Sequence, residues 1–394
     1  MKIRASLLAL LLALTALSLH PALAQQDDAI TLPAPLGPHA VGRVEIDLID
    51  PDRPEIWTED PDDIRELHVT VFYPAVDTPD GEPAVYMAEN LREALAQAKG
   101  YDAAGLARVR PNSRVEMPLL TSEAPYSLLI FLPGYAGHPL QYTALLEEIA
   151  SHGYVVAALS HPYFTEVTRF SDGRLVNRPP LEQLTATTMS DETVQVVADT
   201  QFAIDQLLSL NADHPLLAGS IDPDRIAIFG HSYGGAVGLD VAAVDARLKA
   251  VINLDGGTLI ITSRGPVDVP YLFIESEVPL MNETEQAELG ISAEAMEISR
   301  ESVRQTFARV PSGYNLFVPG MRHASFLDWG YLHQWVDGLY ASDGYGTIDP
   351  VLVYALTSDF MRAFLDLHLN AAPDSRMEAV FTQYPDVVVE TYPQ

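Results

Sequence analysis

The sequence predicts an α/β fold with a mostly parallel central sheet covered by helices on both faces. Three observations support this prediction. Residues 127–132 form an almost continuous apolar run, which is typical of a strand buried on both faces. After this run, short apolar segments alternate with segments of helical periodicity, as they do where crossover helices connect parallel strands. The chain has 394 residues, of which 48% are hydrophobic, so a large core can form.

The first residues have the layout of a secretory signal peptide. Lys2 and Arg4 precede an uncharged, mostly apolar run over residues 5–19, and Ala22 and Ala24 are the small residues of a cleavage site. The run is short for a membrane span, and no other segment is apolar over the length that a span needs. We expect residues 1–24 to be a signal peptide that directs export to the periplasm or out of the cell. An uncleaved anchor helix is the alternative.

Composition excludes several kinds of function. The formal net charge of −31 argues against a nucleic-acid partner, because phosphates attract a basic surface. The chain has no Cys, so disulfides, thiol catalysis and Cys-ligated zinc are excluded. No two His have the helical spacing of a zinc site. We therefore expect neither a cofactor nor a metal.

The chain divides into a short lead-in and one domain. Residues 25–40 are polar and contain Pro, which predicts a flexible segment. Alternating apolar residues from Val41 predict a first strand, and residues 67–73 predict a second. We expect residues 41–394 to form a single α/β domain. Cap-like insertions are expected at about 80–125, 162–190 and 280–310.

Apolar periodicity assigns the remaining elements. Further strands are expected at 154–159, 225–229, 250–254, 271–274 and 314–318. Helices are expected at about 88–98, 142–149, 191–210, 236–244, 283–309 and 351–369. The helix at 191–210 has an acidic first turn, which suits the positive end of its dipole.

A Gly-x-Ser-x-Gly sequence, Gly230-His231-Ser232-Tyr233-Gly234, lies between a buried strand and a helix of small residues. The chain must turn from strand to helix within about one residue, which strains the backbone at Ser232 and raises its hydroxyl above the sheet. Side chains two positions away would collide, so Gly is needed there. The sequence therefore predicts the nucleophile elbow of the α/β-hydrolase fold, with Ser232 as the nucleophile.

The general base of this fold lies on a loop after the last parallel strand, from which it can reach the nucleophile. His323 fits this position, because it closely follows the strand predicted at 314–318. His333 is the only real competitor. His231 lies inside the elbow, and we expect its side chain to point away from the Ser232 hydroxyl.

A carboxylate must hold the base in one tautomer and stabilise its cation. Asp255 ends one predicted strand, while Glu275 and Glu277 end the next, and both strand ends reach the same edge of the sheet. The residues favour Asp255 and leave the two glutamates open. Asp328 is a weaker candidate, because a loop or helix-capping Asp is common in such a position.

Two backbone N–H groups are expected to bind the oxyanion of the tetrahedral intermediate. One belongs to Tyr233, the residue after the nucleophile. The other should come from the loop after residues 127–132. Pro133 has no N–H, which leaves Tyr135 as the best candidate.

Several ordered blocks lie between about Glu66 and Trp329. They contain Phe-Tyr-Pro, Leu-Ile-Phe-Leu-Pro-Gly-Tyr-Ala-Gly, Ile-Ala-Ser-His-Gly-Tyr-Val-Val-Ala-Ala, Gly-His-Ser-Tyr-Gly-Gly, Asn-Leu-Asp-Gly, Leu-Phe-Ile-Glu-Ser-Glu and, most specifically, Gly-Met-Arg-His-Ala-Ser-Phe-x-Asp. In these blocks the chain resembles the secreted platelet-activating-factor acetylhydrolases and their bacterial relatives. The resemblance implies that the acid is Asp255. It also implies a calcium-independent esterase that removes short acyl groups, including acetyl from the middle position of ether phospholipids.

Together these residues predict an exported serine hydrolase that cleaves carboxylic esters with Ser232, His323 and Asp255. The substrate is expected to be a small-molecule ester or a lipid. A lipase-like or cutinase-like polyester hydrolase is the alternative within this class. A serine peptidase and a non-catalytic binding protein on the same fold are the alternatives from other classes.

Overall fold

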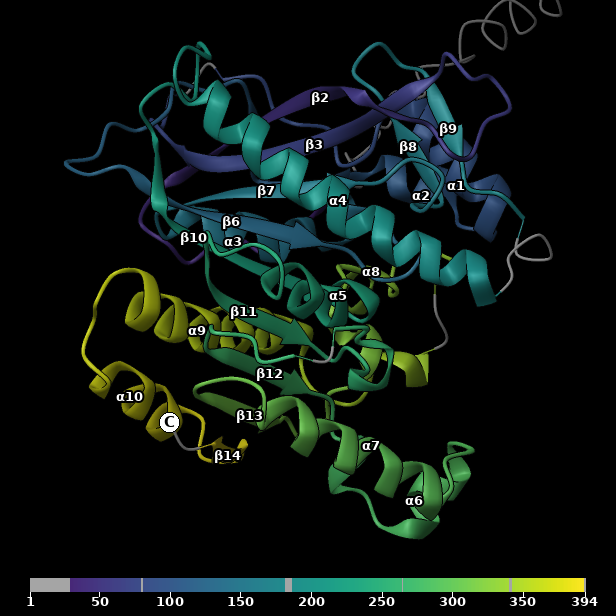
Figure 1. The fold of residues 1–394 in the computed structure, drawn as a ribbon, viewed down its shortest axis with the longest axis vertical. Coiled ribbons are helices and arrows are strands. Elements are labelled where there is room, and N and C mark those ends of the chain that lie inside the picture. Colours follow the sequence, from purple (N-terminus) through teal and green to yellow (C-terminus); the bar gives the residue numbers. More distant parts are fainter. Residues whose placement is uncertain (1–28, 79–80, 181–185, 264, 340–341, 393–394) are drawn as a thin grey trace, which may run out of the picture.

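The structure is a computed structural model that describes residues 29–78, 81–180, 186–263, 265–339 and 342–392. The predicted signal peptide, residues 1–24, lies outside the described residues. A ten-stranded sheet crosses the molecule (Figure 1). Its strands are β2 (Ala40–Pro54), β3 (Ile64–Ala75), β5 (Arg114–Val115), β6 (Tyr126–Leu132), β7 (Tyr154–Ser160), β10 (Ile221–His231), β11 (Leu248–Leu254), β12 (Tyr271–Glu275), β13 (Gly313–Phe317) and β14 (Val388–Tyr392).

The strand order is β14-β13-β12-β11-β10-β6-β7-β3-β2-β5. The six strands from β13 to β7 are parallel to their neighbours. Antiparallel pairs flank them, β13 with β14 on one side and β7 with β3, then β3 with β2, on the other. Every residue of β6 and of β7 is buried, as predicted for strands covered on both faces.

Helices cover both faces of the sheet. One face carries α4 (Ala186–Leu210), α5 (Tyr233–Ala242) and α7 (Ala293–Phe307). The other carries α1 (Glu89–Lys99), α3 (Thr143–Ser151), α8 (Trp329–Leu332), α9 (Pro350–Leu369) and α10 (Ser375–Gln383). In Figure 1, α4 and α5 lie in front of the sheet. The predicted α/β architecture is confirmed.

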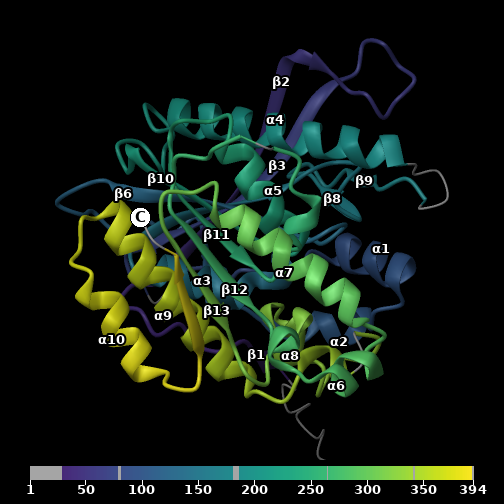
Figure 2. The same cartoon turned by 60° about the horizontal axis from the view of Figure 1, so that its bottom comes forward.

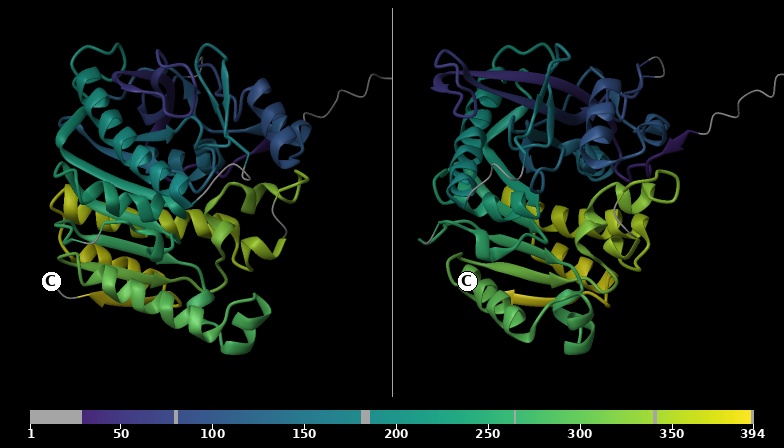
Figure 3. Two further views of the ribbon diagram at one scale, coloured as in Figure 1. Left: turned by 45° about the vertical axis from the view of Figure 1, so that its right-hand side comes forward. Right: turned by 90° about the vertical axis from the view of Figure 1, so that its right-hand side faces the viewer.

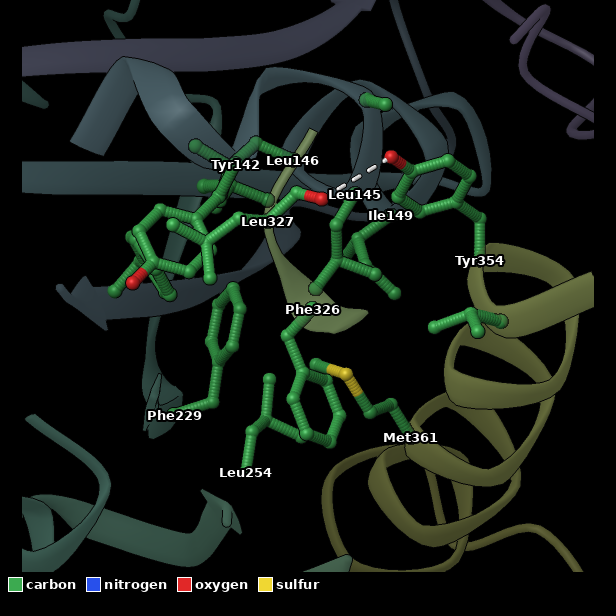
Figure 4. Close-up of a cluster of buried hydrophobic side chains, with 14 of the residues drawn as sticks. Tyr142, Leu145, Leu146, Ile149, Phe229, Leu254, Phe326, Leu327, Tyr354 and Met361 are labelled. Atoms are coloured by element: carbon green, nitrogen blue, oxygen red, sulfur yellow. Dashed lines mark hydrogen bonds between the residues drawn. The ribbon is translucent and has the colours of Figure 1, made fainter. Parts of the chain in front are cut away.

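Figure 4 shows the core between the sheet, α3 and α9. Buried apolar side chains from these elements meet there, namely Leu145, Leu146 and Ile149 of α3, Phe229 and Leu254 of the sheet, and Met361 of α9. Phe326 and Leu327 lie among them, and the hydroxyl of Tyr354 donates to the carbonyl oxygen of Leu327 at 3.5 Å. Because Phe326 follows His323 closely in the chain, this core anchors the loop that holds His323.

The described part of the lead-in packs against the domain. Ile30–Thr31 form β1, which pairs in parallel with β4 (Val109–Arg110), and Ile30 and Leu32 are buried. This differs from the flexible segment predicted for residues 25–40. The physical reason is that two apolar side chains close together in a polar stretch can bury themselves against a neighbouring segment.

The three predicted insertions contain regular elements. The first holds α1, α2 (Ala103–Ala107), β4 and β5, and the second holds a hairpin of β8 (Val167–Arg169) and β9 (Leu175–Asn177). The third contains α6 (Glu283–Glu288) and α7, which lie at the β13–β14 end of the molecule (Figure 3). The long β2–β3 hairpin projects from the body in Figure 2. Their function as caps stays a prediction.

Two elements near the end of the chain were not predicted, α10 and the edge strand β14. All five residues of β14 are exposed or half-buried, so its sequence lacks a continuous apolar run. Within the described residues, no helix combines the length and the apolar character needed to cross a membrane.

Candidate active site

Ser232 lies at the turn between β10 and α5. Its backbone has φ 54° and ψ −123°, a conformation that residues other than glycine rarely adopt. The N–H of Ser232 donates to the carbonyl oxygen of Leu254 at 2.9 Å. A Cβ on Gly230 would lie 2.4 Å from the carbonyl carbon of Gly234, and one on Gly234 would lie 2.2 Å from the carbonyl oxygen of Leu132. Both glycines are therefore required by the close approach of backbone segments.

Ser232, His323 and Asp255 form a chain of hydrogen bonds. His323 Nε2 lies 2.9 Å from Ser232 Oγ, and His323 Nδ1 lies 2.7 Å from Asp255 Oδ2. With the Nδ1–H donating to the carboxylate, the neutral imidazole directs the lone pair of Nε2 at the hydroxyl. In this arrangement the imidazole can take a proton from Ser232.

The three hydrogen-bonded side chains come from three turns at the carboxyl edge of the sheet. Asp255 follows β11 with φ 52°, and its second carboxylate oxygen accepts from the N–H of Ser276 at 2.8 Å. His323 begins a short 3-10 turn, η5 (His323–Phe326), after β13. The strand ends of a parallel sheet meet at one edge, which brings residues distant in the sequence together.

The other predicted candidates have different partners. Glu275 is buried beside Asp255, and burial raises the pKa of its carboxyl to about 8. Glu277 accepts a hydrogen bond from the N–H of Gly320 at 2.6 Å. The Nδ1 of His333 lies 2.8 Å from a carbonyl oxygen of its own helix, α8. The structure therefore brings Asp255, and not Glu275 or Glu277, into contact with the imidazole of His323.

Asp328 is fully buried at the start of α3. Its carboxylate accepts from the N–H groups of Thr143 and Ala144 at 2.9 and 3.0 Å, and from the hydroxyl of Tyr86 at 3.0 Å. These contacts cap α3, since they satisfy N–H groups that have no partner within the helix. Across the described residues, no three His, Asp or Glu side chains are grouped as metal ligands would be.

A second chain of hydrogen bonds links the elbow to the loops on either side of it. His231 Nε2 lies 2.8 Å from the carbonyl oxygen of His323, and its Nδ1 lies 2.9 Å from the hydroxyl of Tyr142. That hydroxyl also accepts from the N–H of Gly134 at 3.3 Å. Burial, and then the neighbouring His323, lower the pKa of His231 well below its usual range, so the ring is neutral with its proton on Nε2. The sequence assigns Tyr142 to an apolar helix face and contains no signal for this contact.

The loop of residues 133–137 passes close to Ser232. A Cβ on Gly134 would lie 3.3 Å from the Cβ of Ser232. Tyr233 is the first residue of α5, so its N–H has no acceptor within the helix. The two predicted oxyanion donors, the N–H groups of Tyr135 and Tyr233, thus belong to segments that adjoin Ser232 from two elements.

The side chains of Tyr135 and Tyr233 belong to a packed cluster with Phe164, with ring centroids 5.0 to 5.6 Å apart. The guanidinium of Arg178 lies 4.1 Å from the centroid of the Tyr135 ring and forms a buried ion pair of 2.9 Å with Glu192. Phe164 and Arg178 come from the second insertion. The sequence gives no signal for these contacts, because they join segments that share no local pattern.

A cavity of about 510 Å³ opens at His323 and Asp255. Helix α7 contributes Met296 and Val303 to its wall, and the segment before α7 contributes Leu289 and Ile291. The residues at the end of β12 form another part of the wall. The third insertion therefore shapes the space next to the imidazole.

The fold and this arrangement at the sheet edge define a class of protein. Residues 129–390 match the model of the alpha/beta hydrolase family, and the chain belongs to this family. Residues 24–170 also match the model of platelet-activating factor acetylhydrolase, isoform II.

Individual relatives agree with this assignment. A probable 1-alkyl-2-acetylglycerophosphocholine esterase of Arthroderma benhamiae is 29% identical over 243 residues, which cover 57% of this chain and 59% of the relative. The platelet-activating factor acetylhydrolase of Cavia porcellus is 29% identical over 192 residues, covering 43% of this chain and 44% of the relative. The chain thus spans less than two thirds of the length of either relative. The solved structure of a ferulic acid esterase from Streptomyces cinnamoneus superposes with a TM-score of 0.74 at 25% identity, covering 91% of this chain and 98% of that one.

Proposed function

We propose that this protein is a serine esterase that hydrolyses carboxylic esters with Ser232, His323 and Asp255. The observation that supports this most strongly is the unbroken pair of hydrogen bonds, 2.9 and 2.7 Å long, from hydroxyl through imidazole to carboxylate. The strained turn that raises Ser232 above the sheet supports the same assignment. The relatives are named as acetylhydrolases and esterases, which is consistent with this chemistry.

In the proposed reaction, Ser232 Oγ attacks the ester carbonyl carbon while His323 Nε2 takes the hydroxyl proton. The N–H groups of Tyr135 and Tyr233 stabilise the negative charge on the carbonyl oxygen. The bond to the alcohol oxygen then breaks, this oxygen receives the proton from His323, and the acyl group stays on Ser232. Water, activated by the same imidazole, releases the acid and restores the serine. Asp255 holds the proton on Nδ1 and stabilises the imidazolium cation.

We infer that the substrates are small-molecule esters with short acyl groups, including acetylated lipids. The names of the relatives support this inference. The close packing of Tyr135, Phe164 and Tyr233 beside the oxyanion loop supports it as well, because it leaves little space there for a long acyl chain. A series of p-nitrophenyl esters of increasing acyl length separates this proposal from a lipase-like or cutinase-like function, which would favour the longer chains.

The reaction is tested with a Ser232→Ala variant. We expect kcat for p-nitrophenyl acetate to fall at least about a thousandfold, because the nucleophile is lost. Labelling by a fluorophosphonate probe should disappear at the same time. Ser209→Ala, at an exposed serine of α4, serves as the matched control and should retain both. Undiminished turnover by Ser232→Ala would overturn the proposal.

We also propose that residues 1–24 direct export. The basic start, the apolar run and the small residues at Ala22 and Ala24 support this. Expression of the full chain followed by N-terminal sequencing of the exported protein is the test, and a mature chain that begins at Gln25 is the expected result. A protein that stays in the cell with Met1 in place would contradict the proposal.

A further inference from the structure

The cavity at His323 is mainly apolar. Its volume of about 510 Å³ lies within the range of about 300–1,000 Å³ that is typical of small-molecule sites. His323 and Asp255 line it, whereas Ser232, Tyr135 and Tyr233 are not among the described residues around it. Its apolar wall includes Phe273, Val278, Leu289, Ile291, Met296 and Val303. The cavity can therefore hold a sizeable apolar group next to the imidazole.

The position of His323 identifies which part of an ester lies closest to this cavity. The oxygen of the departing alcohol must come within hydrogen-bond reach of His323 Nε2, because it receives its proton from there. The carbonyl oxygen must instead face the N–H groups of Tyr135 and Tyr233. The alcohol side of the substrate thus begins at the imidazole, where the cavity opens. Beside the two tyrosines, packed side chains occupy the space.

Two ionisable side chains near the cavity, Arg322 and Glu275, carry no free charge, while the carboxylate of Asp255 accepts hydrogen bonds from His323 and from the N–H of Ser276. Arg322 lies at its edge and is paired with Glu277 at 3.2 Å. Glu275 is buried in its wall, and burial raises the pKa of this carboxyl to about 8, so it is protonated at neutral pH. An uncharged alcohol can enter such a space without losing strong hydration, whereas an ionic group would have to leave water for an apolar wall.

We propose that the cavity beneath α7 binds the alcohol portion of the ester, and that it selects uncharged alcohols with a bulky apolar body. The proposal rests on the proposed esterase function. It adds that α7 contacts the alcohol portion of the ester and not the acyl portion. Met296 and Val303 of α7 and Leu289 before it are the specificity-determining contacts.

Acetate esters with alcohols of increasing size test the proposal, since the acyl group stays constant. Each buried methylene should raise kcat/KM about fourfold, so hexyl acetate should exceed ethyl acetate by at least tenfold. 3,3-Dimethylbutyl acetate has the shape of acetylcholine without its charge, and we expect it to be cleaved at least tenfold faster in kcat/KM than acetylcholine. Equal values for the neutral and the charged ester would overturn the selection for uncharged alcohols.

Met296→Trp fills the cavity, while Ile298→Trp places the same side chain on the exposed part of the same helix as a matched control. Met296→Trp should lower kcat/KM for hexyl acetate at least tenfold and change that for ethyl acetate less than threefold. Ile298→Trp should leave both within twofold. Ala295→Phe, at an exposed cavity residue, repeats the test if Met296→Trp does not fold. If Met296→Trp instead lowered kcat/KM for ethyl hexanoate and left the values for ethyl acetate and hexyl acetate unchanged, the cavity would bind the acyl chain. That result would overturn the proposal.

Binding of the alcohol alone separates this proposal from the esterase function. The Ser232→Ala protein should bind hexan-1-ol in a calorimetric titration, and the added Met296→Trp substitution should weaken that binding at least tenfold. This readout needs no turnover. If the wild-type protein cleaves esters but the Ser232→Ala protein does not bind hexan-1-ol, the cavity assignment alone is overturned. If the Ser232→Ala protein binds hexan-1-ol but the wild-type protein does not cleave esters, the proposed reaction is overturned.

Discussion

The imidazole Nε2 of His231 donates a hydrogen bond to the backbone carbonyl oxygen of His323 at 2.8 Å. One residue of the elbow therefore holds the loop that carries the proposed base. The other nitrogen of the same ring contacts Tyr142, whose hydroxyl accepts from Gly134 in the oxyanion loop. We propose that His231 is a positioning residue that holds the proposed base, the proposed nucleophile and the loop of residues 133–137 relative to one another.

Substitution of His231 tests this positioning. His231→Leu removes the donor, and a displacement of the base by about 1 Å can lower a rate about a hundredfold, so we expect kcat to fall about 10- to 100-fold with little change in KM. His231→Gln keeps an N–H donor and should retain more of the activity than His231→Leu. Steady-state kinetics with p-nitrophenyl acetate provide the measurement. Equal losses in the two variants would argue against the hydrogen bond as the cause.

The identity of the acid is tested by Asp255→Asn. The amide preserves the shape but favours the wrong tautomer of His323, so kcat should fall about a thousandfold to ten-thousandfold while thermal unfolding stays nearly unchanged. Glu277→Gln is the comparison and should change kcat less than tenfold, because Glu277 bonds Gly320 and not the imidazole. A larger loss in Glu277→Gln than in Asp255→Asn would reassign the acid.

Two glycines of α5 should respond oppositely to the same substitution. A Cβ on Gly235 would lie 2.1 Å from Asn253 Oδ1, so Gly235→Ala should destabilise the protein by about 1–3 kcal/mol and disturb the elbow. On Gly238 the nearest atom would be 3.6 Å away, so Gly238→Ala should stabilise the helix by about 0.5–1 kcal/mol. Urea unfolding of both variants provides the measurement. Similar changes in the free energy of unfolding of the two variants would show that the space around the new Cβ does not determine the change in stability.

Glu275 should make stability depend on pH. Its pKa is raised from the ordinary value of 4.5 to about 8 in the folded protein. Between these values the folded protein retains a proton that the unfolded chain has released, so the stability contributed by this group falls as pH rises, by about 1.4 kcal/mol per pH unit. The free energy of unfolding of Glu275→Gln should therefore increase relative to that of the wild type between pH 5 and pH 8. Above pH 8 the difference between the two proteins should stay constant. Urea unfolding at pH 5, 7 and 9 tests this, and a constant difference between the two proteins would contradict it.

The parallel part of the sheet was predictable because its strands are buried on both faces. The prediction of 250–254 corresponds to β11, and that of 271–274 corresponds to β12, each within two residues at either end. The edge strand β14 has no such pattern, because all of its residues are exposed or half-buried. It is formed by its pairing with β13, which is a tertiary property.

The predicted site residues could be brought together from the sequence because each follows a strand of one parallel sheet. Ser232 and Asp255 follow the neighbouring strands β10 and β11, and His323 follows β13, which is separated from β11 only by β12, so the order of the strands brings them to one part of the sheet edge. The sequence could not predict the contacts of His231 with His323, or of Arg178 with Tyr135. These contacts join loops of irregular structure, whose paths depend on packing rather than on periodicity.

Tyr392 of β14 stacks on Phe307 of α7, with ring centroids 3.8 Å apart and ring planes at 5°. Strand β14 therefore supports α7, the helix that lines the cavity at His323. Both elements are distant in sequence from the elbow at Ser232. Clipping of residues 388–392 by a protease would loosen α7 first and leave the parallel strands intact. If the proposed function is correct, a C-terminal affinity handle fused close to Tyr392 would alter the preference among esters without altering the chemistry of cleavage.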